Sequence, residues 1–277
     1  INLEKILPDV AFVGYPPIET AYVMTHWLKK KKIPSILDIK DQWPVILTKN
    51  AAEIIQPFLK IILTPYYWLA KNAMRNASCI CAMSDGFIDW SLKFCKRKKS
   101  KFDIIVPLTS PVNAITEIQK KKALSYWSNK GIKNNKKFRI IFIGSFSNSF
   151  DFDKIIKSAE ELYKLKKNVE FILCGDGDLA LNLRNKVKKI KNIKIIEWIN
   201  IPKIVTLSNM SSAFIAPYKN SSDFTISVPN KIIDAFRLEL PLLSPLKGEV
   251  KALIKKHNAG YCYTDYKSLT KKIISLI

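Results

Sequence analysis

The stretch from Ser227 to Asp234 carries the residues best suited to chemistry. Pro229 is typical of the first turn of a helix, and Lys231 and Asp234 would then share one helix face. A lysine in a first turn gains nothing from the helix dipole, so an anionic ligand at that helix end would explain it. Lys231 and the backbone amides would take phosphates, and Asp234 would accept sugar hydroxyls. The alternative is an exposed Lys–Asp pair worth less than about 1 kcal/mol.

Two glycine-containing loops follow apolar, strand-like runs. Gly144-Ser145-Phe146-Ser147 comes after the first run, and Gly175-Asp176-Gly177 comes after the next. Glycine lets the backbone approach a phosphate, and backbone amides can then donate to its oxygens. Neither loop is a Gly-x-Gly-x-x-Gly or a Walker motif, so a tight turn or a helix N-cap explains each loop about as well.

Short β-rich runs alternate with helical stretches, which predicts βαβ units and mainly parallel sheets. In the first part we expect strands at 9–13, 35–39, 78–82 and 103–106, and helices at 18–30, 51–76 and 85–96. In the second part we expect strands at 138–143, 169–174, 193–197, 213–217, 240–244 and 260–263, and helices at 153–165, 179–189, 202–209, 229–238, 250–256 and from 267 onward. Ligands of such sheets bind at the carboxyl ends of the strands, so the loops after Ile143, Cys174, Glu197 and Pro217 are the ones to inspect.

The composition bounds the classes of partner. The chain has 277 residues and 48% hydrophobic residues, which suits one large or two ordinary α/β domains. The formal charge of +23 suits nucleic acid, anionic lipid or a merely solvated surface. Tight runs at 29–32, 96–99 and 120–122 contribute to it. No nucleic-acid-binding signature is visible, so we expect no nucleic-acid partner.

The cysteines and histidines give no metal or nucleophile pattern. Cys79, Cys81, Cys95, Cys174 and Cys262 are odd in number and lack zinc-ligand spacing, so we interpret them as mostly buried in a reducing compartment. The two histidines, His26 and His257, are far apart in the sequence, and we expect no metal site. No signal peptide or bilayer-spanning apolar run is visible. We therefore expect a cytoplasmic location, with peripheral contact at the inner face of the plasma membrane left open.

The part from Phe138 onward resembles the C-terminal domain of retaining, family-four GT-B glycosyltransferases. The resemblance is carried by the ordered set of the Gly144 loop, the Gly175 loop, Trp198, Pro202 and the Pro229-x-Lys231-x-x-Asp234 pattern. It implies that Asp234 holds the ribose of a nucleoside-diphosphate sugar and that Lys231 and the Gly144 loop lie near the diphosphate. Trp198 and Ile199 would lie near the base. The implied donor-binding residues are Gly144, Ser145, Gly175, Asp176, Gly177, Trp198, Ile199, Ser227, Pro229, Asn230 and Asp234.

The same part departs from the family pattern at two places. Many members carry Glu-x7-Glu, but Ile226 stands at the position of the first glutamate. Many members also place cations after the first glycine, whereas residues 145–150 contain none. Lys231 would therefore have to do more of the work on the diphosphate.

The first part resembles the acceptor domain of the same enzymes, in the branch that builds bacterial surface polysaccharides. Residues 38–44, Asp-Ile-Lys-Asp-Gln-Trp-Pro, are similar to the signature Asp-x-Arg-Asp-Leu-Trp-Pro of that branch. The resemblance implies that Lys40 and Asp41 face the cleft between the domains, beside Lys231 as catalytic residues. Capping and turn formation are the alternative roles for Asp38 and Asp41.

We therefore expect an α/β protein of the GT-B class, with two Rossmann-like domains facing across a cleft and an incomplete first domain. Residues 1–110 would be the acceptor-side domain, 111–137 a linker with some helix around 118–127, and 138–277 the donor-binding domain. The chain begins with Ile1 and ends at Ile277 within a helical pattern. These ends favour a fragment, with roughly 100 residues of the first domain absent.

One apolar and aromatic segment, residues 57–69, has two interpretations. Its flanking lysines suit a helix in a membrane interface. We favour the other interpretation, an ordinary core or subunit-contact helix.

The functional hypothesis is a retaining, metal-independent glycosyltransferase that uses no cofactor. It would move a sugar from a nucleoside-diphosphate sugar to a lipid-linked or saccharide acceptor in surface-polysaccharide (lipopolysaccharide or capsule) synthesis. Two alternatives remain. A non-catalytic GT-B partner subunit suits the missing cations and glutamate. A nucleotide-sugar epimerase would need acid/base carboxylates and usually a histidine in its cleft.

Overall fold

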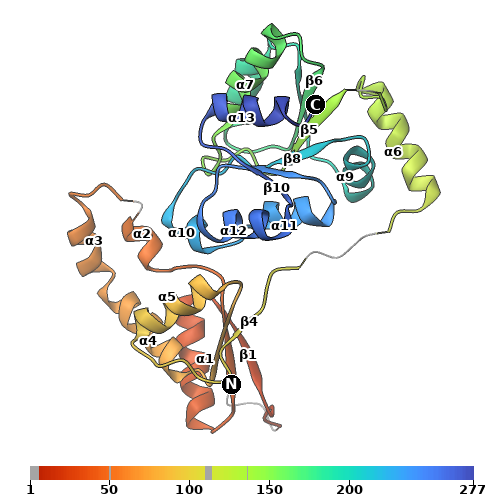
Figure 1. Cartoon of the computed structure of the whole chain (residues 1–277). Coiled ribbons are helices and arrows are strands. Elements are labelled where there is room, and N and C mark those ends of the chain that lie inside the picture. Colours follow the sequence, from red (N-terminus) through yellow and green to blue (C-terminus); the bar gives the residue numbers. More distant parts are fainter. Residues whose placement is uncertain (1–5, 50, 110–113, 136) are drawn as a thin grey trace. The chain divides into compact units, whose positions relative to one another are not determined.

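The chain forms two compact units, Ile1–Leu108 and Thr109–Ile277 (Figure 1). The computed structural model describes residues 6–49, 51–109, 114–135 and 137–277. Each unit is built around its own parallel β-sheet, which agrees with the α/β class. The Ile1 end and the neighbouring residues to position 5 lie outside the described residues.

The sheet of the first unit has its strands in sequence order, β1-β2-β3-β4, and every neighbouring pair is parallel. β2 and β3 are largely buried, whereas β1 lies at one edge and leaves Phe12 exposed. The strands are β1 (Ala11–Tyr15), β2 (Ser35–Ile39), β3 (Cys79–Ala82) and β4 (Ile104–Ile105). The helices are α1 (Ile18–Lys30), α2 (Val45–Lys49), α3 (Gln56–Ile62), α4 (Thr64–Asn76) and α5 (Asp85–Cys95).

The expected single helix over 51–76 is wrong, because this stretch contains two helices. Pro57 lies in the first turn of α3 and Pro65 in the first turn of α4. Proline lacks the N–H that a helix interior needs, so each one marks a new start. The core interpretation of residues 57–69 is also wrong for α3, which has no buried residue. The short helix α2 was not expected.

The second unit has a six-stranded parallel sheet in the order β7-β6-β5-β8-β9-β10. Counted along the chain from β5, this is the 3-2-1-4-5-6 order of a Rossmann sheet. The strands are β5 (Phe138–Ile143), β6 (Val169–Cys174), β7 (Ile193–Ile196), β8 (Ala213–Ile215), β9 (Leu242–Ser244) and β10 (Gly260–Cys262). The helices are α6 (Glu117–Asn129), α7 (Phe152–Lys164), α8 (Ala180–Val187), α9 (Ile201–Ser208), α10 (Ser222–Ile226), α11 (Asn230–Arg237), α12 (Gly248–His257) and α13 (Tyr266–Ile274).

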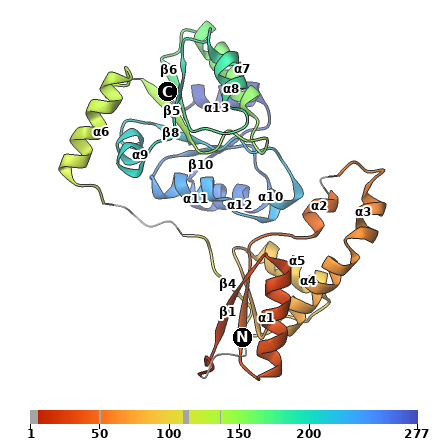
Figure 2. The ribbon, with the colours of Figure 1, turned by 180° about the vertical axis from the view of Figure 1, so that it is seen from behind.

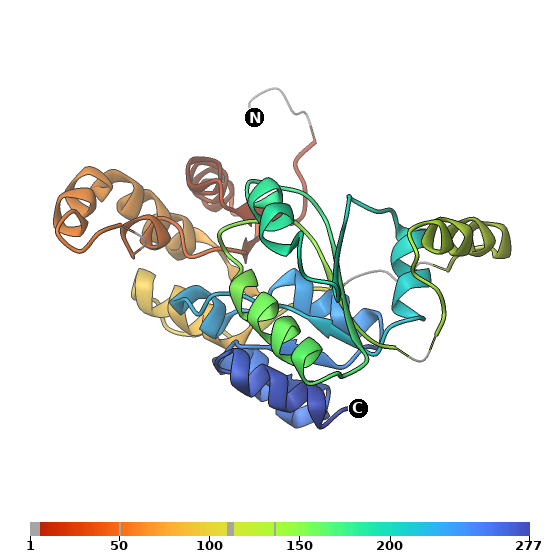
Figure 3. The ribbon, with the colours of Figure 1, turned by 90° about the horizontal axis from the view of Figure 1, so that it is seen from above.

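Much of the segment expected as a linker, 111–137, belongs to the second unit. Its helix α6 lies beside α9 in the views from behind and from above (Figures 2 and 3). Trp127 of α6 is buried, and its indole N–H donates to the carbonyl of Lys203 at 3.0 Å. The buried Trp127 ring and its hydrogen bond fix α6 to the unit. The polar composition of the segment gives no sign of this attachment.

An aromatic cluster fixes the loop that follows β5. Phe142, Phe146, Phe150 and Phe152 are all buried, with neighbouring ring centroids 5.1–5.9 Å apart. Burying each such side chain contributes about 1.5–3 kcal/mol. Three of the four lie in or directly after the loop that begins at Gly144, so the loop is held by packing as well as by its backbone.

The five cysteines are free thiols. Cys79, Cys81 and Cys174 are buried, as expected; Cys95 is also buried, and Cys262 is half-buried. Burial raises the pKa of the Cys81 thiol to about 12, so this group is an inert part of the first sheet.

Candidate functional site

The second sheet reverses its strand order between β5 and β8. At such a point the connections leave the two strands toward opposite faces, and a crevice opens at their carboxyl ends. β5 ends at Ile143 and β8 at Ile215, so the loops that begin at Gly144 and Ala216 border this crevice. The topology therefore places the candidate site at the Gly144 loop.

The two glycine loops pack on each other through their backbones. A Cβ on Gly175 would lie 1.8 Å from the carbonyl oxygen of Gly144, and a Cβ on Gly177 would lie 2.9 Å from that of Phe146. The φ angles of Gly144, Gly175 and Gly177 are +154°, +154° and +141°, which L side chains rarely adopt. The N–H of Phe146 donates to the carbonyl of Asp176 at 2.8 Å. The glycines are therefore needed for close backbone approach, and the two loops act as one structure.

Lys231 lies directly over this structure. A Cβ on Gly144 would be 2.3 Å from Cε and 3.4 Å from Nζ of Lys231, so the lysine side chain occupies the space that the glycine leaves. Its Nζ lies 3.0 Å from Oδ2 of Asp234, and both side chains are partly buried. The expected grouping of Lys231, Asp234 and the Gly144 loop is present in the structure. An ammonium and a carboxylate at one crevice suit a ligand with both anionic and hydroxyl groups.

Tyr218 is a site residue that sequence reasoning missed. It follows β8 and is buried close to Lys231 and Asp234. Burial raises the pKa of the Tyr218 hydroxyl, the backbone of Lys231 lowers it in part, and the charge of Asp234 raises it again. The signal that could have found it was its place directly after the strand at the reversal point.

The start of α11 is set by the residues that were expected there. Pro229 is the N-cap and Asn230 the first helical residue, while Ser227 is buried just before them. The preceding helix α10 was not expected. Its N-cap, Ser221, accepts a hydrogen bond from the N–H of Phe224 at 3.4 Å. α10 ends at Ile226, so three residues, 227–229, connect this short helix to α11.

The other predicted donor-binding residues fall into two groups. Ser145 and Asp176 are exposed on the two glycine loops. Trp198 and Ile199 follow β7, two strands away from β5. Trp198 is 63% exposed, whereas Ile199 is 4% exposed and packs in the core. Of this pair, only Trp198 offers its side chain to a ligand.

Lys40 and Asp41 lie at the carboxyl end of β2 in the first unit. Nζ of Lys40 lies 3.0 Å from Oδ2 of Asp38, which is buried and also accepts from the Cys81 thiol at 3.4 Å. Asp41 is exposed. The ion pair with Asp38 gives Lys40 a structural role in the first unit, and its catalytic role stays a prediction.

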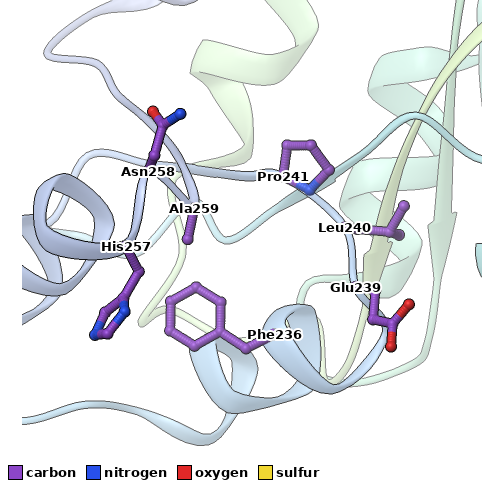
Figure 4. Close-up of a pocket in the computed structure, with 7 residues that line it drawn as sticks. All are labelled: Phe236, Glu239, Leu240, Pro241, His257, Asn258 and Ala259. Carbon is purple, nitrogen blue, oxygen red and sulfur yellow. The ribbon is translucent and has the colours of Figure 1, made fainter.

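A pocket of about 490 Å³ lies elsewhere on the second unit (Figure 4). Leu240 and Pro241 precede β9, and Asn258 and Ala259 precede β10, so the pocket is at the amino ends of these strands. It therefore lies at the opposite end of the sheet from the Gly144 loop. Phe236 and His257 face each other across it in Figure 4. None of the predicted site residues lines it.

The part of the chain that the structure describes contains neither a metal-ligand cluster nor a membrane-spanning helix. Within that part, no group of three or more His, Cys, Asp and Glu residues is placed to hold a metal ion. None of its helices has the length and apolarity needed to cross a bilayer.

The sequence of the second unit matches a known family. The sequence model of the family described as glycosyl transferases group 1 matches residues 137–277, just over half of the chain. No curated protein sequence matches the chain significantly.

The structure is similar to solved glycosyltransferases at low sequence identity. Sucrose-phosphate synthase from Thermosynechococcus elongatus has a TM-score of 0.66 at 11% identity, with 97% of this chain and 64% of that chain covered. WaaG, a glycosyltransferase involved in lipopolysaccharide biosynthesis, has a TM-score of 0.57 at 13% identity, with 96% and 90% covered. A TarM variant from S. aureus, solved with fondaparinux, alpha-GlcNAc-glycerol and UDP, has a TM-score of 0.55 at 10% identity, with 93% and 52% covered. The chain thus spans less than two thirds of the length of the sucrose-phosphate synthase, and these likenesses establish the GT-B fold.

Proposed function

The chain belongs to the group 1 glycosyl transferases, and on that basis we propose that it transfers a sugar from a nucleoside-diphosphate sugar to a lipid-linked or saccharide acceptor. The reaction proceeds with retention, without a bound metal or cofactor, in the cytoplasm. This transfer is a step in the synthesis of a surface polysaccharide. The TarM variant solved with UDP and a GlcNAc-glycerol supports the nucleotide and saccharide classes, and WaaG supports the polysaccharide class.

One observation carries the proposal: the side chain of Lys231 fills the space over Gly144 at the reversal point of a Rossmann sheet. A diphosphate leaving a sugar develops negative charge, and a preorganised cation stabilises that charge without reorganisation. Residues 145–150 contain no cation, so in this proposal Lys231 is the residue that supplies one. The N-terminus of α11 adds its partial positive charge at the same place.

Asp234 has two roles in this proposal. In the structure its carboxylate lies 3.0 Å from the Lys231 ammonium. With donor bound, the diphosphate takes over Lys231, and the Asp234 carboxylate accepts the ribose hydroxyls. After the exchange the Lys231 ammonium faces an anion and the Asp234 carboxylate still accepts hydrogen bonds, which matters in a partly buried site. Lys40 and Asp41 are proposed to serve the acceptor side, and Trp198 the base.

The test is the binding of UDP and GDP to the 277-residue chain, measured by isothermal titration calorimetry. Lys231→Ala removes a charge-assisted contact worth about 1.5–3 kcal/mol, so we expect binding to weaken by roughly 10- to 150-fold. Lys189→Ala, an exposed lysine of the same unit, is the matched control and should bind as the unchanged protein does. Equal affinity in the two variants would contradict the role of Lys231.

The transfer assay separates the enzyme from the non-catalytic alternative. That alternative is favoured by the absence of cations at 145–150. A chain that binds UDP or GDP through Lys231 but neither transfers nor hydrolyses the sugar is a binding subunit. Turnover that depends on Lys231 supports the transferase.

A further inference from the structure

Helix α3 of the first unit carries apolar side chains that none of the described residues of the unit covers. It has seven residues, and none of them is buried. Phe58 is 64% exposed and Ile61 is 71% exposed. Figures 1 and 2 show α3 projecting from the end of α4, away from the sheet of the unit. Contiguous exposed apolar side chains on a folded unit mark an interaction surface.

The apolar surface continues on both sides of α3. We call it the apolar tip, and it consists of the exposed residues Leu47, Ile54, Ile55, Phe58, Ile61 and Ile62. Its edge on the first turn of α4 carries the exposed ring of Tyr66. Aromatic residues with a polar atom favour the boundary between water and hydrocarbon. An apolar tip with an aromatic edge therefore suits a boundary between hydrocarbon and water.

The charge around the tip selects the kind of surface. Between Val45 and Lys71 the chain has three lysines and one acidic residue, Glu53. Lys49 and Lys60 are exposed beside the tip residues. Lysines next to an apolar face favour anionic lipid headgroups, because the ammonium groups remain at the headgroups while the apolar side chains enter the acyl region. The cationic border argues for an anionic lipid surface in preference to a second copy of this basic chain.

A cavity of about 540 Å³ adjoins the tip within the same unit. Leu47 belongs both to the tip and to the cavity lining, and Leu63, which directly follows the tip residue Ile62, also lines the cavity. Trp43 and Tyr66 add aromatic rings, and Glu19 is the only charged residue in the lining. An apolar recess that opens beside the tip is accessible to a lipid chain from the same surface.

We propose that the apolar tip inserts into the surface of a membrane that contains anionic lipids, with Lys49 and Lys60 at the headgroups. The inference goes beyond the proposed function, because insertion requires neither donor nor transfer. The apolar cavity beside the tip then receives the apolar portion of a lipid from that membrane.

Vesicle co-sedimentation tests the proposal on the 277-residue chain without nucleotide. The vesicles are phosphatidylcholine alone or phosphatidylcholine with about 30% phosphatidylglycerol, an anionic lipid of the kind that attracts basic segments. The test variant is Phe58→Ser/Ile61→Ser, whose positions are exposed, so it should retain its circular dichroism and melting temperature. The matched control is Leu181→Ser, at a residue of α8 that is 74% exposed.

We expect the unchanged chain and Leu181→Ser to bind the anionic vesicles and the double variant to partition at least about tenfold less, since two apolar side chains no longer enter the bilayer. Lys60→Glu should weaken binding, and so should about 1 M salt, where the Debye length falls to about 3 Å. Failure of the unchanged chain to bind, or equal binding by the double variant, would overturn the proposal. So would a dimer in size-exclusion chromatography that the double variant abolishes without any vesicle binding. Nucleotide affinity is measured separately, so a failure here leaves the donor-site test unaffected.

Discussion

The two parallel sheets differ in how their strands are ordered. The second sheet reverses direction between β5 and β8, whereas the first runs in sequence order from β1 to β4. A reversal opens a crevice at the carboxyl ends, and a sheet without one has no such crevice. The second unit therefore acquires its candidate ligand site from its topology.

The first unit makes its recess by other means. Its cavity is lined by residues of the loops after β1 and β2, among them Pro16 and Trp43, and by Leu63 and Tyr66 near the start of α4. The glycine loops of the second unit pack backbone against backbone, but the cavity of the first unit is walled by side chains. Side-chain walls can repack, and backbone contacts cannot shift without moving strands. We therefore expect the second site to be rigid and the first to be adaptable.

The largest difference between the sheets should appear in their buried ion pairs. Arg139 on β5 is fully buried with Glu170 on β6, at an N···O distance of 3.0 Å. Glu170→Ala leaves this cation uncompensated and should cost about 3–5 kcal/mol of unfolding free energy, measured by urea denaturation. In the first unit Asp103→Ala should cost about 1–3 kcal/mol, because the side chain of Arg97 is partly exposed to water whereas that of Arg139 is not. A larger loss from the first unit's variant would reverse the comparison.

The glycines provide the next largest contrast. Gly175→Ala places a Cβ 1.8 Å from the carbonyl oxygen of Gly144 at a φ of +154°, and it should cost about 3 kcal/mol. Gly14→Ala on β1 meets only the carbonyl oxygen of Pro16 at 3.9 Å and should change stability by less than about 1 kcal/mol. Thermal unfolding followed by calorimetry measures both. Similar losses in the two variants would show that the glycine loops are not rigid.

The smallest effect concerns the attachment of α6 and its dependence on pH. The hydrogen bond from the Tyr126 hydroxyl, at 2.5 Å, is the main reason that the pKa of Glu197 falls from 4.5 to about 2, and the Lys130 ammonium lowers it further. A carboxyl group whose pKa is depressed on folding stabilises the protein above its unfolded pKa. This contribution is lost as the pH falls through the folded value. The unchanged protein should therefore melt at a slightly higher temperature than Glu197→Gln. This difference should be constant from pH 7 to about 5 and should disappear toward pH 2.

If Glu197→Gln retained its deficit at pH 2, the carboxylate of Glu197 would not be what holds α6.

Local pattern predicted most of the elements. The bounds of α1, β2, β5 and β6 agree with those expected, because alternation of apolar residues and flanking turn residues fixes the period of an element. The break between α3 and α4 and the presence of α10 were missed. Pro65 in the first case and Ser221 in the second were visible signals of a helix start.

For the candidate site, the sequence predicted which residues take part better than it predicted what surrounds them. Gly144, Gly175, Lys231 and Asp234 were all singled out, and the structure brings them together. The role of Tyr218 at the start of α11 was not predicted, and neither was the burial of Ile199. A short motif shows which side chains are present but not which of them are buried in the core.

The sequence by itself determined that the chain is an α/β protein with parallel sheets and that glycines and a proline–lysine–aspartate pattern follow particular strands. These features depend on residues close together in the chain, where sterics and hydrophobic periodicity act directly. Only the tertiary structure decided that the second sheet reverses beside Gly144, that Lys231 fills the space above it, and that α3 leaves its apolar face uncovered. Strand order and burial depend on contacts between residues far apart in the chain, and local propensity contains no information about those contacts.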